Sequence, residues 1–173
     1  MKKSLIIFAA VLMLAGFTSK VMAQATDTKS NDANAQILGA IALTAVNPLE
    51  FGGLVASTGG TVVMSTAGVR SVGSGAVTLI SSTVTPTAAS YTVTGTGLTS
   101  YAITIPTASF DVTNTTGAGA ETMTVTAMDC SKGAVSAFAA NGTDAFTVGG
   151  TLTVGSAQVP GVYTGTFDVT VAY

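Results

Sequence analysis

The sequence predicts an all-β protein built as an antiparallel β-sandwich. Short apolar or alternating runs recur between Gly, Pro and Asn residues, and no segment carries a convincing helical period. Thr is abundant at alternate positions of these runs, as on the solvent-facing side of a half-buried sheet. Because the runs differ in length and their connections are irregular, we expect an immunoglobulin-like sandwich rather than a closed barrel.

The first 25 residues predict export. Lys2 and Lys3 precede an apolar run over 5–17, and small residues follow, so we expect a signal peptide over 1–23, with cleavage after Ala23 or Ala25. The apolar run is shorter than the roughly 20 residues that span a bilayer, and no Cys lies near the cleavage site. We therefore expect no membrane or lipid anchor after cleavage, and export through the periplasm to the cell surface or the extracellular space.

The rest of the chain divides into an arm and one domain. Residues 24–34 are polar and lack large apolar side chains, which predicts a flexible N-terminal arm. Residues 35–173 are long enough for a single β-sandwich domain with one core.

Strands are expected in ten places along this domain. They lie around 37–43, 49–51, 62–64, 77–80, 91–93, 101–105, 110–112, 123–127, 146–154 and 161–173. We expect Gly59-Gly60 to form a turn before the third run and Pro106 to end the sixth, because proline cannot donate to a ladder. Residues 132–140 could hold one helical turn or a loop.

The last two strands give the clearest patterns. Gly149-Gly150 indicate a bulge or bend within a single long strand over 146–154. Residues 161–173 alternate strictly, which predicts one terminal strand of the core. Its predicted buried row is Tyr163, Phe167, Val169, Val171 and Tyr173, and its outer row is Thr164, Thr166, Asp168 and Thr170.

The composition argues against an enzyme. The sequence has no His, which removes the usual general base and the commonest metal ligand. One Cys and no His cannot form a zinc site, and residues 27–32 lack the Gly and distal Glu of a calcium loop. We therefore expect no catalytic, cofactor-binding or metal-binding residues.

The acidic residues are expected to lie singly in turns or on the wet faces of strands, so that no two form the carboxylate pair of a glycosidase. They are Asp27, Asp32, Glu50, Asp111, Glu121, Asp129, Asp144 and Asp168. Without Lys2, Lys3 and Lys20 the formal net charge of −2 becomes −5. This surface argues against nucleic acid or an anionic membrane as partner.

For a few polar and aromatic residues the sequence supports both a structural and a functional interpretation. Cys130 is the only cysteine, so an internal disulfide is impossible; we expect a small buried residue, the alternative being an intermolecular disulfide or a reactive thiol. Asn114 and Asn141 open glycosylation-type triplets, but Asn141-Gly142 is better interpreted as a turn. The four tyrosines, Tyr91, Tyr101, Tyr163 and Tyr173, are expected in the core with their hydroxyls at the sheet margin.

Five segments together resemble a known family. They are Leu49-Glu-Phe-Gly52, Gly59-Gly-Thr-Val62, Tyr101-Ala-Ile-Thr-Ile-Pro106, Phe146-Thr-Val-Gly-Gly-Thr-Leu152 and 161–173. The chain resembles the secreted bacterial family called domain of unknown function 4402, which is similar to spore coat protein U and chaperone-usher pilin domains. The resemblance implies a pilin-like sandwich at the cell surface, with no established catalytic residues to transfer.

Two functions follow as expectations. The first is a secreted, non-enzymatic structural or adhesive surface protein that associates through strand edges and could meet a periplasmic chaperone. The arm before Ala35 offers no bulky apolar residues, so a donor strand would have to be the segment from Ala35 to Leu43. The alternative is a monomeric module that binds a surface glycan or matrix through loops at 53–60 and 127–143.

Overall fold

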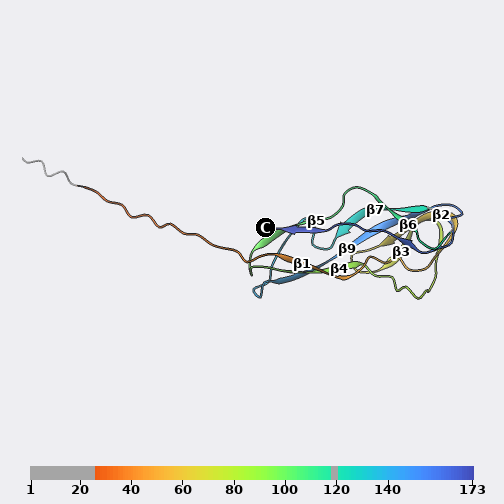
Figure 1. Ribbon diagram of the computed structural model, residues 1–173, viewed down its shortest axis with the longest axis horizontal. Coiled ribbons are helices and arrows are strands. Elements are labelled where there is room, and N and C mark those ends of the chain that lie inside the picture. Colours follow the sequence, from red (N-terminus) through yellow and green to blue (C-terminus); the bar gives the residue numbers. More distant parts are fainter. Residues whose placement is uncertain (1–25, 118–120) are drawn as a thin grey trace, which may run out of the picture. The chain divides into compact units, whose positions relative to one another are not determined.

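The computed structural model describes residues 26–117 and 121–173, and the predicted signal peptide lies outside this range. The described residues divide between Gln36 and Ile37 into an N-terminal segment and the unit Ile37–Tyr173. Residues 26–36 form no helix or strand and their side chains are exposed. All strands belong to the unit Ile37–Tyr173 (Figure 1). In the described part of the chain, no helix is long and apolar enough to cross a membrane.

All regular structure in the described residues is β-strand, and every pairing is antiparallel. The strands are β1 (Ala42–Asn47), β2 (Leu54–Met64), β3 (Arg70–Leu79), β4 (Ala89–Thr94), β5 (Ser100–Thr104), β6 (Phe110–Asn114), β7 (Thr122–Cys130), β8 (Val135–Ala137), β9 (Thr143–Val154), β10 (Tyr163–Thr164) and β11 (Thr170–Ala172). The predicted all-β, antiparallel class is confirmed.

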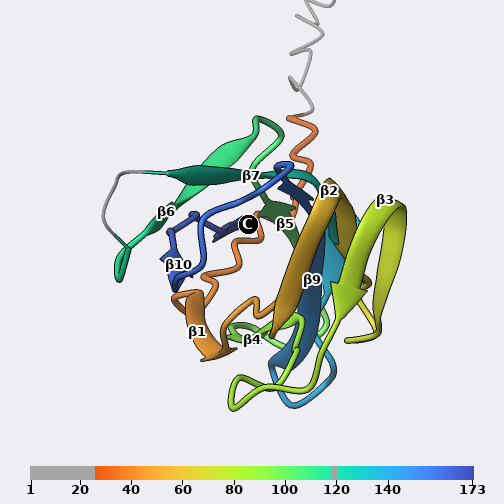
Figure 2. The ribbon, with the colours of Figure 1, turned by 90° about the vertical axis from the view of Figure 1, so that its right-hand side faces the viewer.

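The long strand β9 is the centre of the larger, eight-stranded sheet. One edge of β9 pairs with β7, and the other edge pairs first with β4 and then with β2. The sheet therefore runs β1-β4-β9-β7-β6-β10, and a β2-β3 ribbon branches from the second half of β9 (Figure 2). The smaller sheet has the order β11-β5-β8.

Two groups of buried side chains form the core. The aromatic cluster comprises Ala89, Val93, Tyr101, Ile103, Cys130, Phe138, Phe146 and Val148. It draws on β5 of the small sheet and on β4, β7 and β9 of the large sheet, so the two sheets pack face to face in a sandwich-like arrangement. The aliphatic cluster comprises Val62, Val77, Val125, Leu152 and Val154, all from the large sheet.

The prediction of one long strand through Gly149-Gly150 is confirmed, and the bulge lies on its neighbour. β9 is continuous, whereas β7 shifts register between Thr126 and Asp129. Ala127, inside this shift, has a φ of 48°, the left-handed region that non-glycine residues rarely adopt. A Cβ at Gly150 would lie 2.7 Å from the Met128 sulfur, so the glycine makes room for the bulge.

The predicted turn at Gly59-Gly60 is wrong. Both glycines lie inside β2, where the pairing with β3 shifts register. Gly59 has a φ of 82°, and a Cβ at Gly60 would collide with the carbonyl oxygen of Ser74. The glycines therefore serve a bulge and a close approach of two backbones, and the chain does not reverse there.

The segment 132–140 contains the short strand β8 rather than a helical turn. Three residues of β8 pair with Ser100, Tyr101 and Ala102 of β5. A run of three residues is too short to give a readable alternation, and the pairing comes from a distant part of the chain. The first strand also differs from the prediction, because β1 begins at Ala42 and the Ile37 side chain is 96% exposed.

The segment 161–173 is not one strand. β10 pairs with β6 of the large sheet, and β11 pairs with β5 of the small sheet, so the segment passes from one sheet to the other. The alternation persists in part, because Phe167, Val169 and Val171 are half-buried and Phe167 stacks on Phe110 at 5.4 Å. Tyr173 is 46% exposed, so its predicted burial is wrong.

Candidate functional site

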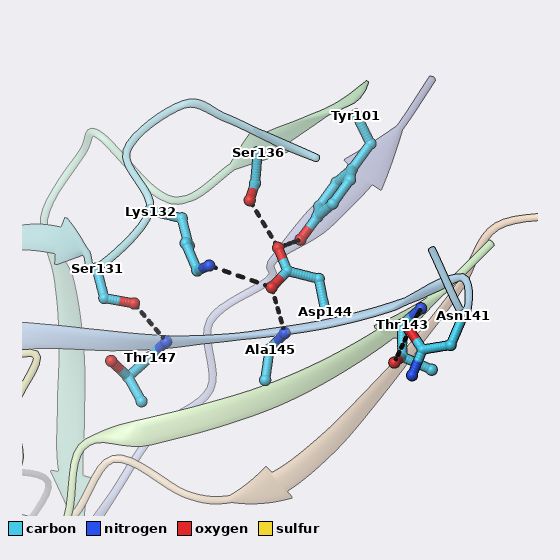
Figure 3. A network of polar contacts seen from close by, with 9 residues as sticks. All are labelled: Tyr101, Ser131, Lys132, Ser136, Asn141, Thr143, Asp144, Ala145 and Thr147. Atoms are coloured by element: carbon cyan, nitrogen blue, oxygen red, sulfur yellow. Dashed lines mark hydrogen bonds and ion pairs between the residues drawn. The ribbon is translucent and has the colours of Figure 1, made fainter. Parts of the chain in front are cut away.

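A polar cluster around Asp144 brings together ionisable and hydroxyl side chains from both sheets (Figure 3). Asp144 Oδ2 accepts hydrogen bonds from the Tyr101 hydroxyl at 2.9 Å and the Ser136 hydroxyl at 2.6 Å. Asp144 Oδ1 accepts from the Ala145 N–H at 2.8 Å and lies 3.2 Å from Lys132 Nζ. The cluster thus joins β5 and β8 of the small sheet to β9 of the large sheet.

The ionisation of this cluster follows from its surroundings. Burial alone would raise the pKa of Asp144, but the bonds from Ser136, Ala145 and Tyr101 and the Lys132 ion pair together hold that pKa below its usual value. Burial raises the pKa of Tyr101 to about 12, and the bond to Asp144 adds to this shift. At neutral pH the cluster therefore holds a carboxylate at Asp144 and a neutral phenol at Tyr101.

This arrangement is suited to holding strands together rather than to reaction. Both Asp144 oxygens already accept bonds, and Tyr101 is only 1% exposed, so a substrate has no access to the phenol. Within residues 26–117 and 121–173, no three Cys, Asp or Glu side chains lie close enough to hold a metal ion. The prediction that every acid lies singly on a wet surface is wrong for Asp144, whose side chain is 12% exposed.

Several other acids do occupy exposed positions. Asp111 is exposed and accepts a bond from the Thr124 hydroxyl, and Asp168 is exposed as predicted. Asp129 is exposed and its side chain accepts a bond from the Cys130 N–H.

Two hollows open on the surface. The first encloses about 320 Å³ and is lined by Val46, Ser90, Tyr91, Thr92, Ser131, Ala145, Phe146 and Thr147. Its rings, Tyr91 and Phe146, stack at 5.1 Å, and Phe146 is only 2% exposed. Ser90, Thr92, Ser131 and Thr147 bring aliphatic hydroxyls to this hollow. Ser90 Oγ and Ser131 Oγ each accept one internal bond, and the Thr147 hydroxyl donates to the Thr66 carbonyl oxygen, so these groups retain only part of their hydrogen-bonding capacity.

The second hollow, about 330 Å³, lies between the end of β5 and the end of β7. Its lining includes Ile103, Ile105 and Cys130. Cys130 is 8% exposed and free, so the expectation of a small buried residue is confirmed. The predicted binding loop at 53–60 is wrong, because Leu54 to Gly60 belong to β2.

The remaining predicted positions have structural roles. Tyr101 is a core residue as predicted, and its hydroxyl reaches Asp144. Asn114 is buried, and its Oδ1 accepts bonds from the Thr116 and Gly117 N–H groups, so it fixes a loop and is closed to modification. Asn141-Gly142 forms the predicted turn, in which Gly142 has a φ of 74°.

The edges of the sheets offer a different kind of surface. β3 pairs only with β2, and β1 pairs only with β4 in the described residues. Figure 2 shows β3 at the margin of the large sheet. An edge strand presents N–H and C=O groups that another strand can pair with. The sequence pattern predicted edges in general, but it could not identify which strands occupy them.

The fold and these surfaces define a class: an all-β, antiparallel, two-sheet domain in whose described residues no three Cys, Asp or Glu side chains gather as a metal site would need. A family model, Domain of unknown function (DUF4402), matches residues 41–173. The chain belongs to this family. No match to a curated protein or to a solved structure was found.

Proposed function

We propose that this protein is an exported, non-enzymatic surface protein with a pilin-like, immunoglobulin-like fold, which acts in structure or adhesion by associating through its strand edges. The observation that carries the proposal is the set of edge strands that the large sheet has in the described residues, of which β3 and β1 are the longest. Main-chain pairing at such an edge is a known mode of recognition between proteins.

Composition and burial support this proposal over an enzyme. The sequence has no His, and the polar cluster has one carboxylate, Asp144, whose oxygens both accept hydrogen bonds. The predicted signal peptide supports export, in which case a periplasmic chaperone is a natural partner before assembly.

Surface exposure and association can be measured together. Antibody labelling of intact cells should detect the protein, and size-exclusion chromatography of the exported protein should give a mass above that of one chain. A strict monomer that antibodies reach only after cell lysis would contradict the proposal.

The alternative is a monomeric module that binds a carbohydrate or matrix. The hydroxyl-lined first hollow beside Tyr91 favours it, because an aromatic ring next to hydroxyl groups suits a sugar. A glycan array distinguishes this function. Binding that is lost in Tyr91→Ala and retained in Tyr173→Ala, a tyrosine outside the hollow, would support the module; an array without signal would argue against it.

A further inference from the structure

The free edge of β3 differs from the other sheet edges in length and cover. β3 has ten residues, whereas β8, β10 and β11 have two or three. β1 has six, shifts register between Ala45 and Asn47, and its Cα atoms approach those of β11 within 8 Å. In the described part of the chain, β3 is therefore the longest run of edge backbone.

Only the bulge in the first part of β3 guards this edge. Natural edge strands are usually protected by a charged side chain or a proline, and from Ser71 to Leu79 the strand has neither. The next charged residue after Arg70 is Asp111. Arg70 itself is occupied: its guanidinium donates to the carbonyl oxygens of Phe51 at 2.7 Å, Gly53 at 2.9 Å and Ile80 at 3.1 Å.

The last three residues of β3 form its regular part, because the pairing with β2 shifts register a second time between Ala76 and Val77. The pairing with β2 skips Gly73, and Gly75 has a φ of 74°, so the first part is bulged. Beyond this bulge, Val77, Thr78 and Leu79 pair in register with Ala56, Val55 and Leu54. The stretch Ala76–Leu79 is apolar or β-branched, which favours further strand pairing.

Exposed aliphatic side chains flank this stretch. Val77 is buried in the aliphatic cluster, so Thr78 and its neighbour Val55 face the other side of the ribbon, and both are exposed. Ile80, two residues beyond Thr78, is also exposed. A strand docked on the edge would gain main-chain bonds and cover part of this apolar surface.

We infer that the Ala76–Leu79 edge of β3 pairs antiparallel with the same edge of a second copy of this chain. This inference rests on the proposed association through strand edges and names the edge and the partner. A second copy brings an equally uncharged strand, so no like charges meet at the ladder. Because the contact is the same patch on both copies, it closes on itself and gives a two-fold dimer rather than a filament.

The pleat restricts the register of the dimer. The Val77 side chain must face the core in both copies. Residues on the outer face of one β3 strand therefore pair with residues on the outer face of the other. Thr78 of one copy then pairs with Thr78, Ala76 or Ile80 of the second copy. In the last two registers the two Thr78 side chains are diagonal neighbours. Charges placed at position 78 of both copies therefore interact.

Sedimentation velocity of the exported protein tests this geometry. The unchanged protein should sediment as a dimer, and Thr78→Lys and Thr78→Glu should each halve the mass while keeping the circular dichroism spectrum of the folded protein. An equal mixture of the two variants should restore the dimer, because opposite charges then meet across the pairing. Thr44→Lys, the same change at an exposed position of β1, should leave the dimer intact.

The outcomes separate the two proposals. If the protein associates but Thr44→Lys dissociates it and both Thr78 variants do not, the β3 inference is overturned and edge association through β1 stands. Thr78→Lys and Thr78→Glu could each abolish the dimer while their equal mixture fails to restore it. That result would also overturn the self-pairing geometry. A monomer at every concentration that antibodies also fail to reach on intact cells removes the proposed function with the inference.

Discussion

The two core clusters stabilise the sandwich in different ways. The aromatic cluster joins both sheets, stacks Tyr101 on Phe138 at 4.5 Å, and extends through Tyr101 into the polar bonds of Asp144. The aliphatic cluster comes from one sheet and is covered by further residues such as Phe110 and Val112. The difference indicates that the part of the domain around the aromatic cluster is stabilised by contact between the two sheets. The part around the aliphatic cluster is stabilised by buried side chains that all come from strands of the large sheet.

The largest effect is expected where an aromatic side chain connects the sheets. Phe146→Ala should lower the free energy of unfolding by about 3–5 kcal/mol, because it removes a buried ring and leaves a cavity. Leu152→Ala, on the same strand but in the aliphatic cluster, should cost about 2–4 kcal/mol. Chemical denaturation measures the free energy of unfolding of both variants. A larger loss of stability in Leu152→Ala than in Phe146→Ala would contradict the expected order of the two clusters.

The polar part of the aromatic half should contribute next. Asp144→Ala leaves the buried Tyr101 hydroxyl and the Ser136 hydroxyl without their acceptor, which should cost about 2–3 kcal/mol. Asp111→Ala is the matched control, since Asp111 is exposed and accepts one bond from Thr124; its expected cost is below about 0.5 kcal/mol. Equal losses in the two variants would mean that Asp144 does not tie the sheets together.

Acid should weaken the same half of the molecule. The pKa of Asp144 is lower in the folded chain than in the unfolded chain, so its contribution is fully present above the unfolded value and is lost as pH falls through the folded value. Thermal unfolding from pH 7 down to pH 2 should therefore show a steeper loss below about pH 4 in the unchanged protein than in Asp144→Asn. Parallel curves for the two proteins would argue against this linkage.

The smallest effect is expected at the solvent side of the cluster. The Lys132 side chain is 43% exposed, and an ion pair in this setting contributes little. Lys132→Met should lower the free energy of unfolding by less than about 1 kcal/mol, as measured by denaturation in low and high salt. A loss as large as that of Asp144→Ala would place the ion pair, rather than the hydroxyl bonds, at the centre of the cluster.

Much of the aliphatic half could be predicted from the sequence, and less of the aromatic half. A short apolar run identified the region of Val62, and alternation of apolar residues identified those of Val125 and Leu152, because such local patterns need no distant information. The polar cluster could not be predicted, since Asp144, Tyr101 and Ser136 meet only after β5, β8 and β9 have been brought together.

The sheet crossing of the last segment illustrates the same limit. The alternation over 161–173 sets which side chains face inward, but it does not determine which strand lies alongside. Tyr163 and Thr164 pair with β6, whereas Thr170 to Ala172 pair with β5. At Gly59-Gly60 the local pattern itself is ambiguous. Two glycines suit a turn, but they suit equally well a bulge where two backbones approach closely.

Cys130 provides a built-in reporter of how the domain opens. Its thiol is buried where the end of β7 pairs with Val148 of β9, and the sequence has no other cysteine to compete for a reagent. Cys130 is 8% exposed and borders the second hollow, so a thiol-specific dye should react slowly in the closed state and faster when these strands separate; the rise of its labelling rate with denaturant therefore reports that local opening. If labelling becomes slower at high protein concentration, association with a second chain restrains the local opening of β9.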